Sequence, residues 1–442
     1  MTFITNVRVT DVRFPTSLSA AGSDAMNKDG DYSATYVTIE TSDPTLRGFG
    51  FTFTIGRGND ICVSAAELRA KPLLGRELDD VTGDLGATYR DLKSDSQLRW
   101  LGPDKGVEHL ALAAVMNAVW DLAARRAGLP LWRFLLSFSP RELVDLADFQ
   151  YVTDVLSKDE AVALLEAQVS TRDARIRELD GTGYPCYTTS AGWLGYSDDK
   201  LRALCQEAVD AGYKHVKLKV GADLADDVRR CRIAREVLGD DANLMIDANQ
   251  VWDVDQAIEW VGALAEFRPL WIEEPTSPDD AVGHATIRRS VAPIGVATGE
   301  HGMNRVLFKQ MFQLGAIDFC QLDAARLASI NEVVTVYLMA AKFGVPVCPH
   351  AGGVGLCELV QHLSIFDYVA VSASLDGRVT EFVDHLHEHF TAPCIVEDGA
   401  YVLPDAAGYS AEMFPESVEE YAYPDGAYWS LRLEQAEAEA VA

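Results

Sequence analysis

HVKLKVG (215–221) and LMIDANQ (244–250) open a series of apolar, β-branched segments that each end in charged or polar residues. The series continues with LWIEEP (270–275), IGVATGE (294–300), FCQLDAA (319–325), VPVCPH (345–350) and VTEF (379–382). The charged ends recur about every 23 to 31 residues, which is the length that one parallel strand and its returning helix need. Segments this apolar are typical of parallel strands covered on both faces. The series therefore predicts an α/β barrel, whose strands end at one common rim.

The residues at these strand ends carry complementary charges. They are Lys217, Lys219, Asp247, Asn249, Glu273, Glu300, Asp323, His350 and Glu381. For any single one, a solvated turn or a helix cap explains the residue at least as well as a functional role. Their common register favours a functional site. Lys217 and Lys219 also point to the same face of one strand, where two buried ammonium groups need anions beside them.

Asp247, Glu273 and Glu300 end three consecutive strands, so a barrel places their carboxylates side by side. Carboxylates this close repel one another, and a bound cation removes the repulsion. Because all the donors are hard oxygens, we expect the ion to be Mg²⁺. A cation beside two lysines, in a chain of net charge −29, predicts a small carboxylate as the ligand.

The motifs KxK (217–219), DAN (247–249), EEP (273–275) and GE (299–300), followed by the acid, the histidine and the acid of the last three strands, resemble the enolase superfamily in its mandelate racemase-like branch. More narrowly, the chain resembles the L-fuconate dehydratases and their mitochondrial relatives. The matching text is SDAMNKDGDYSA (23–34), SDSQLRWLGP (94–103), YTTSAGWLGYSDDK (187–200), WIEEPTSPDD (271–280), HAGGVGLCELVQHL (350–363) and EFVDHLHEHF (381–390). The resemblance implies a (β/α)7β modified TIM barrel with an α+β capping domain.

The resemblance also implies the chemistry: removal of the α-proton of a sugar acid, stabilisation of an enediolate and loss of the 3-hydroxyl. Lys219 would be the base, with a pKa lowered by Lys217 and the metal. His350, oriented by Asp323, would be the acid. Glu381 would hydrogen-bond the enediolate oxygen and would therefore be protonated or share a proton. The residues expected to bind the substrate are Gly22, Ser23, Asp24, Tyr32, Lys217, Asn249, His350 and Glu381.

Three functions compete. The first is a Mg²⁺-dependent dehydratase of a sugar acid, with L-fuconate favoured. The second is a racemase or epimerase that uses Lys219 and His350 as two opposed bases, and formation of a 2-keto-3-deoxy acid separates the two. The third is a barrel without catalysis that keeps the site by descent. One departure from the common pattern is Ala328 and Ser329, where many members have two glycines, and we expect their Cβ atoms near the pocket floor.

The length of 442 residues suggests more than one domain, with a barrel of about 250 residues among them. We predict a capping domain over 1–150, the barrel over 151–384, and a C-terminal segment over 385–442 that packs back on the capping domain. MTFITNVRVTDVRF (1–14), TYVTIET (35–41) and GFGFTFT (48–54) predict strands of the capping domain. VEHLALAAVMNAVWDLAARR (107–126), followed by Gly128 and Pro130, predicts a helix packed between others.

The acidic balance argues against a nucleic-acid partner, since phosphates need a basic footprint. No apolar run was expected to reach the length of a membrane span, and the N-terminus alternates like a strand, so we predict a cytoplasmic protein without a membrane partner. The eight cysteines show no CxxC pair and predict reduced, buried thiols. Barrels with a capping domain often assemble, so a homo-oligomer is expected.

Some polar and aromatic residues have two interpretations. His109 is expected to be structural, since a buried histidine commonly finds a partner. Trp193 and Tyr196 fit a ligand contact and loop packing about equally. The alternating His385, His387 and His389 could bind a transition metal, but a solvated or packed run is favoured.

Overall fold

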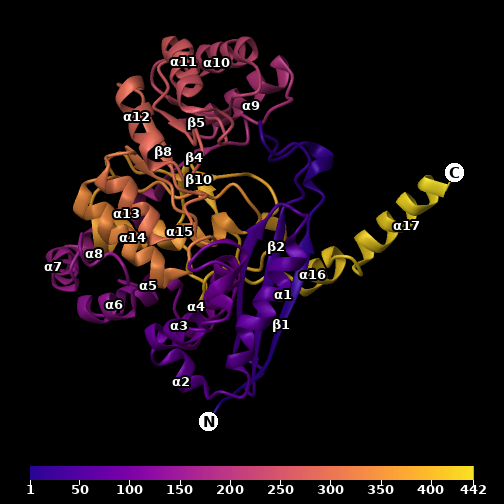
Figure 1. The fold of residues 1–442 in the computed structure, drawn as a ribbon, viewed down its shortest axis with the longest axis vertical. Coiled ribbons are helices and arrows are strands. Elements are labelled where there is room, and N and C mark those ends of the chain that lie inside the picture. The colour runs from indigo at the N-terminus through magenta and orange to yellow at the C-terminus, as the bar shows by residue number, and fades with distance from the viewer. Residues whose placement is uncertain (442) are drawn as a thin grey trace.

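A three-stranded antiparallel sheet begins the chain in the computed structural model, which describes residues 1–441 (Figure 1). Its strands are β1 (Ile4–Arg13), β2 (Ser33–Thr41) and β3 (Arg47–Thr54), in the order β1-β2-β3. Helices follow: α1 (Asn59–Ala70), α2 (Leu78–Thr82), α3 (Leu85–Lys93), α4 (Gly106–Ala127), α5 (Leu131–Leu136) and α6 (Pro140–Leu146). The predicted strands and the predicted long helix are confirmed.

Two glycines on one face of β3 let α4 lie directly on the sheet. A Cβ on Gly48 would lie 2.4 Å from the carbonyl oxygen of Ala118, and a Cβ on Gly50 would lie 2.1 Å from the nitrogen of Ala118. Non-bonded atoms do not approach this closely, so β3 needs glycine at both positions for the α4 backbone to lie against it. The small residues on the facing side of α4, Ala114 and Ala118, complete the close approach.

By length and composition alone, α4 could also cross a membrane, and 89% of its most apolar window is buried inside the protein. The expectation that no run reaches this length was therefore wrong. The helix is apolar because it packs between the sheet and its neighbours, and it ends at Gly128, which has a φ of 67°.

Parallel strands form the second unit. They are β4 (Tyr184–Thr188), β5 (His215–Lys219), β6 (Asn243–Asp247), β7 (Trp271–Glu273), β8 (Gly295–Thr298), β9 (Phe319–Cys320) and β10 (Thr380–Phe382). Each strand from β4 to β9 pairs with the next, and β10 pairs with β4. The helices between them are α9 (Asp198–Asp210), α10 (Leu224–Leu238), α11 (Val254–Leu264), α12 (Ala281–Val291), α13 (Arg305–Gln313), α14 (Ile330–Phe343) and α15 (Leu356–Phe366).

The segment 346–350 lies between β9 and β10. The Cys348 amide donates to the Cys320 carbonyl at 2.8 Å, and the Glu381 amide donates to the Pro349 carbonyl at 3.3 Å. These bonds connect β9 to β10, which returns to β4, and they are consistent with a modified TIM barrel. Side chains from the strands fill the interior as a separate core: Tyr187, Met245, Trp271, Ala297, Cys348 and Val379.

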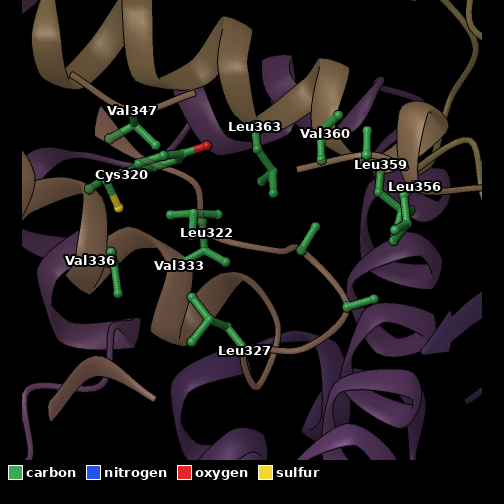
Figure 2. Packing of buried hydrophobic residues seen from close by; sticks show 14 of the residues in the cluster. Cys320, Leu322, Leu327, Val333, Val336, Val347, Leu356, Leu359, Val360 and Leu363 are labelled. Carbon is green, nitrogen blue, oxygen red and sulfur yellow. The ribbon is translucent and has the colours of Figure 1, made fainter. Parts of the chain in front are cut away.

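Apolar helix faces cover the outside of these strands. Figure 2 shows Val333 and Val336 of α14 and Leu359 and Leu363 of α15 gathered with strand-side residues such as Leu322. All of these side chains are fully buried. Because both faces of each strand are dry, the strand ends are the place where polar residues meet solvent or ligand.

The remaining elements connect the units. They are α7 (Lys158–Val169), α8 (Arg172–Thr182), β11 (Val396–Glu397), β12 (Ala400–Tyr401), α16 (Pro415–Tyr421), α17 (Ala427–Val441), the 3-10 turns η1 (Thr16–Ser19), η2 (Lys71–Leu73), η3 (Leu98–Leu101), η4 (Ala265–Phe267) and η6 (His387–His389), and the π-helical turn η5 (Asp367–Ser372). The hairpin β11–β12 adds to β4, so part of the C-terminal segment joins the barrel sheet.

Later residues of the same segment contact the capping sheet. The Tyr423 amide donates to the Asp11 carbonyl at 2.8 Å, and the Trp429 indole donates to the Arg13 carbonyl at 2.9 Å. Beyond these contacts α17 projects from the body of the molecule (Figure 1). The domain boundaries at residues 150 and 384 stay a prediction.

Candidate active site

The ends of β5, β6 and β7 bring two lysines and two acids into contact. Lys219 Nζ donates to Asp247 Oδ2 at 2.6 Å, and Lys217 Nζ lies 3.4 Å from the same oxygen. Lys217 also pairs with Glu273 and, at 3.0 Å, with Glu381 of β10. All five side chains are buried. The structure thus supplies the fixed anions that two buried ammonium groups require.

Asp247, Glu273 and Glu300 each offer an oxygen within 4.8 Å of the other two. Burial, with neighbouring carboxylates, raises the pKa of Glu273 well above its usual range and also raises the pKa of Glu300. Both shifts show that the negative charge gathered here is incompletely balanced by the lysines. Three hard oxygen donors that lack a full countercharge fit a divalent cation such as Mg²⁺. The donor chemistry therefore agrees with the predicted metal site.

Asp247 raises the pKa of Lys219. Burial lowers this pKa, but the Asp247 carboxylate at 2.6 Å outweighs burial, because a carboxylate in direct contact favours the charged lysine. The expected lowering of this pKa assumed a bound cation that shares Asp247, so it stays a prediction.

His350 and Asp323 form the predicted pair. His350 Nδ1 lies 2.8 Å from Asp323 Oδ2, and Nε2 lies 3.7 Å from Glu300 and 3.8 Å from Glu381. Burial lowers the pKa of His350, yet the surrounding carboxylates raise it to about 10. At neutral pH the ring is therefore protonated, and its Nε2–H is the proton that faces the cavity.

Glu381 is ionised in this arrangement. Its Oε2 accepts hydrogen bonds from the amides of Ala351 at 2.9 Å and Gly352 at 3.1 Å, and Thr189 donates to Oε1. Burial raises the pKa of Glu381, but Lys217, His350 and these donors lower it far below its usual value. These contacts favour the ionised form over the fully protonated one, because each group beside the carboxylate donates a hydrogen bond or carries positive charge. A proton shared with a bound substrate stays a prediction.

A cavity of about 260 Å³ opens above these residues, between the strand ends and the N-terminal loop. Its lining includes six of the eight predicted substrate-binding residues: Gly22, Asp24, Tyr32, Asn249, His350 and Glu381. Lys219, Glu300 and Asp323, predicted for catalysis and metal binding, also line it. Ser23 is absent from the lining, since its hydroxyl donates to the Leu194 carbonyl at 2.9 Å and joins the loop to the barrel. Lys217 is fully buried beneath the cavity floor.

Asn249 has a side chain prepared for a ligand. The backbone amide of Asn249 donates to Oδ1 of Asp247, a predicted metal ligand, at 2.9 Å. Its side-chain oxygen is buried and has no hydrogen-bond partner in the described chain. Buried polar atoms are normally paired, so this oxygen is a candidate acceptor for a substrate hydroxyl.

Sequence reasoning missed several residues of the site. Gln321 Nε2 donates to Glu273 Oε2 at 2.6 Å, Thr189 binds Glu381, and His301 and Arg326 line the cavity. Gln321 lies two residues before Asp323, and that period of two is the signal that could have found it. His301 directly follows Glu300, and its Nδ1 lies 2.9 Å from Glu274.

The structure distinguishes the two interpretations of Trp193 and Tyr196, and it shows where Ala328 and Ser329 lie. Trp193 lines the cavity, with the Lys219 ammonium 5.5 Å from its ring, whereas Tyr196 packs under Lys200 outside it. Ala328 and Ser329 are fully buried away from the lining, so the expectation that they shape the pocket floor is wrong. The Ser329 hydroxyl donates to Asn117 of α4 at 2.6 Å, which places it at the contact between barrel and cap.

Two family models match the chain. The model described as "Mandelate racemase / muconate lactonizing enzyme, N-terminal domain" matches residues 7–135, and the model described as "Enolase C-terminal domain-like" matches residues 200–417. The fold and site define a barrel enzyme with a capping domain and an acidic metal site at the strand ends. The chain belongs to the enolase superfamily.

Individual relatives agree over almost the whole chain. Mitochondrial enolase superfamily member 1 from Homo sapiens is 54% identical over 433 residues, which cover 97% of this chain and 98% of that protein. Its crystal structure has a TM-score of 0.96 and covers 98% of each chain. L-galactonate dehydratase from Hypocrea jecorina is 55% identical over 426 residues, covering 95% of this chain and 94% of that protein.

A more distant structure carries a ligand. The crystal structure of L-talarate/galactarate dehydratase from Salmonella typhimurium, liganded with Mg and L-lyxarohydroxamate, is 25% identical with a TM-score of 0.72, and covers 94% of this chain and 92% of that one. These relatives confirm the predictions of a dehydratase-like enzyme of this superfamily and of Mg²⁺ as its ion. They do not include an L-fuconate dehydratase, so that narrower likeness stays a proposal.

Proposed function

We propose that this chain is a Mg²⁺-dependent dehydratase of a six-carbon sugar monoacid, with L-fuconate as the favoured substrate. The observation that carries the proposal is the arrangement of Lys219 and the His350–Asp323 pair on one cavity, with three carboxylates beside them. Mg²⁺ held by Asp247, Glu273 and Glu300 would supply positive charge to the substrate carboxylate as negative charge develops there.

The protein's own residues perform the proton transfers. Lys219 Nζ reaches the cavity and takes the C2 proton, while the fully buried Lys217 contributes fixed positive charge beneath the carboxylate. The protonated His350 gives the Nε2 proton to the departing 3-hydroxyl, and Asp323 holds its ring. Asn249 accepts a hydrogen bond from a substrate hydroxyl through its unpartnered oxygen.

The substrate choice rests on two observations. L-fuconate is the 6-deoxy form of L-galactonate, so the L-galactonate dehydratase relative acts on an acid with the same configuration at C2 to C5. The cavity lining also includes Phe53, Ile55 and Leu110, apolar side chains that suit a terminal methyl group, alongside Arg57 and Arg326, which suit a carboxylate. An apolar pocket rejects an added hydroxyl only weakly, by about 10²-fold at most.

A racemase or epimerase on the same scaffold remains the second candidate. It would need His350 neutral as a base in one direction. The carboxylates around His350 favour its protonated form, and Asp247 does the same for Lys219, so formation of a keto acid is the observation that separates the two candidates. The expected homo-oligomer, the absence of nucleic-acid and membrane partners, and the cytoplasmic location stay predictions.

The test is a screen of sugar mono- and diacids for 2-keto-3-deoxy acid formation. We expect L-fuconate to give the highest kcat/KM, with L-galactonate lower by about 10²-fold or less, and galactarate to be far poorer. Chelation should abolish turnover and added Mg²⁺ should restore it. Epimerised substrate without keto acid would support the second candidate, and a preference for diacids would overturn the proposed substrate.

A further inference from the structure

A second cluster of metal-ligand side chains lies away from the active-site cavity. Cys357, His387 and Cys394 each offer a ligand atom within 4.8 Å of the other two. They come from three segments: the start of α15, the turn η6 and the stretch before β11. Cys357 is fully buried, Cys394 nearly so, and the His387 side chain is 20% exposed, so the cluster is closed but reachable.

The ring of His387 is held in the orientation that metal ligands use. Its Nε2 lies 2.6 Å from the Val383 carbonyl, an acceptor that requires the proton on Nε2. Nδ1 faces the cysteines, 3.6 Å from Cys394 Sγ, and also lies 2.6 Å from Glu358 Oε1, so a metal ion would replace the proton that Nδ1 donates to this carboxylate. A tetrahedral zinc with bonds of about 2.3 Å to sulfur and 2.0–2.1 Å to nitrogen separates these two atoms by about 3.6 Å. A carbonyl on the outer nitrogen is the usual support of a ligating histidine.

Glu358 lies beside the cluster. The side chain is fully buried, and its Oε1 lies 2.6 Å from His387 Nδ1. The same oxygen accepts a hydrogen bond from the backbone amide of Cys394 at 3.3 Å. The other oxygen, Oε2, is buried without a hydrogen-bond partner in the described chain. A buried carboxylate oxygen without a partner is costly. A cation at the cluster would satisfy it.

We propose that Cys357, His387 and Cys394 form a structural site for a thiolate-preferring divalent cation of the Zn²⁺ class, with the Glu358 carboxylate beside it. Two thiolates and a neutral imidazole around such an ion leave a net charge of about zero. Thiolate donors select against Mg²⁺, so this site and the carboxylate site at the strand ends choose different ions. The bound ion ties the segment 387–394 to α15.

The alternating histidines are not a site by themselves. His385 packs against the Tyr32 ring, with centroids 5.4 Å apart, and His389 packs against Phe14 at 4.5 Å. Of the three, only His387 reaches the cysteines. The prediction that favoured a packed run is therefore confirmed for two of them, and the third gains its ligands from distant parts of the chain.

The first experiment uses the full chain without substitutions. The protein is loaded with Zn²⁺, desalted in excess Mg²⁺ and analysed for metal, and we expect about one zinc per chain to remain. Loading with Co²⁺ should give the near-ultraviolet thiolate-to-cobalt absorption, which oxygen donors at the strand ends cannot produce. Asp247→Asn, which lacks an active-site ligand, should keep both signals.

Variants then locate the ion. Cys394→Ser and His387→Gln should lose the zinc and the cobalt absorption, whereas Cys205→Ser, a buried thiol of α9 outside the cluster, should keep both. If a variant fails to fold, the wild-type spectrum still decides. Wild-type protein that retains no zinc in excess Mg²⁺, a cobalt complex without thiolate absorption, or a Cys357–Cys394 disulfide in its place would overturn the proposal.

Discussion

Single residues at the strand ends hold their protons through direct contacts with charged neighbours. Lys219 keeps its proton beside Asp247, and His350 keeps its proton among three carboxylates. These contacts favour the charged form of both groups. A working Lys219 needs Asp247 to be shared with another cation, so base strength and metal binding are coupled at one carboxylate.

Lys219→Ala should stop exchange of the substrate C2 hydrogen with deuterated water. The expected loss is at least about 10²-fold, since no other amine lines the cavity among the described residues. Exchange is followed by NMR on L-fuconate in the presence of Mg²⁺. Sugar-acid binding, measured by calorimetry, serves as the control for an intact site. Exchange at the wild-type rate would assign the base to another residue.

His350→Asn should separate the two half-reactions. The metal ligands and Lys219 stay in place, so C2 exchange continues while formation of the keto acid falls by about 10²–10⁴-fold. Asp323→Asn should show a milder form of the same separation, because Asp323 acts by holding the His350 ring at 2.8 Å. Both reactions are measured on the same sample by NMR. Equal loss of exchange and dehydration would argue against an acid role for His350.

At the scale of elements, the contact between β3 and α4 depends on backbone proximity. The glycines of GFGF in β3 face the helix, and the carbonyl and amide atoms of α4 lie where any side chain would be. The α4 helix carries Asn117, whose amide reaches the Phe51 carbonyl at 3.3 Å and the Ala324 carbonyl at 3.3 Å. The position of α4 thus links the capping sheet to the barrel loop that follows Asp323.

Gly50→Ala should destabilise the protein by about 1–3 kcal/mol or more, because its Cβ would meet helix backbone at 2.1 Å and backbone cannot rotate away. The free energy of unfolding is measured by denaturant titration. Gly181→Ala is the matched control: it lies in α8 with nothing within 4 Å of the added Cβ. That change should stabilise by about 0.5–1 kcal/mol. Similar effects of the two changes would contradict the close approach.

At the scale of the whole molecule, a buried ionic network joins the two units. Glu332 of α14 lies 2.6 Å from His109 of α4 and 2.9 Å from Arg305 of α13. The Arg305 guanidinium also pairs with the Asp104 carboxylate of the capping unit, at 3.1 Å. The structural role predicted for His109 is confirmed. Because the charges are fully buried, each depends on all of its partners.

Glu332→Gln should cost about 1–3 kcal/mol of unfolding free energy, because Arg305 and His109 would both lose a buried carboxylate, although Arg305 keeps Asp104 and Asp148. Tryptophan fluorescence during denaturant unfolding measures the change. Lys342→Ala, in the same helix, removes a solvent-exposed pair with Glu160 and should cost no more than about 1 kcal/mol. Comparable losses in the two variants would show that the buried network does not hold the units together.

Local spacing and periodicity were enough to predict much of this protein. The repeat of charged strand ends predicted the parallel strands, and period-two alternation predicted that Lys217 and Lys219 share a face. The carboxylate cluster followed, since adjacent parallel strands end at one edge. All eight cysteines are buried and free, as predicted. These features depend on contacts between neighbouring strands, and such contacts are encoded in the order of the chain.

Features that depend on distant segments came only from the tertiary structure. The pKa shifts of Lys219 and Glu381 follow from the charged groups and amides beside them, which outweigh the opposing effect of burial. Ser23 and Ser329 face other segments instead of the pocket because loops are placed by packing across domains. The cluster of Cys357, His387 and Cys394 has no sequence spacing of its own, since three separate segments meet there. Sequence determines what each strand end can do chemically, whereas the fold decides which partner each group meets.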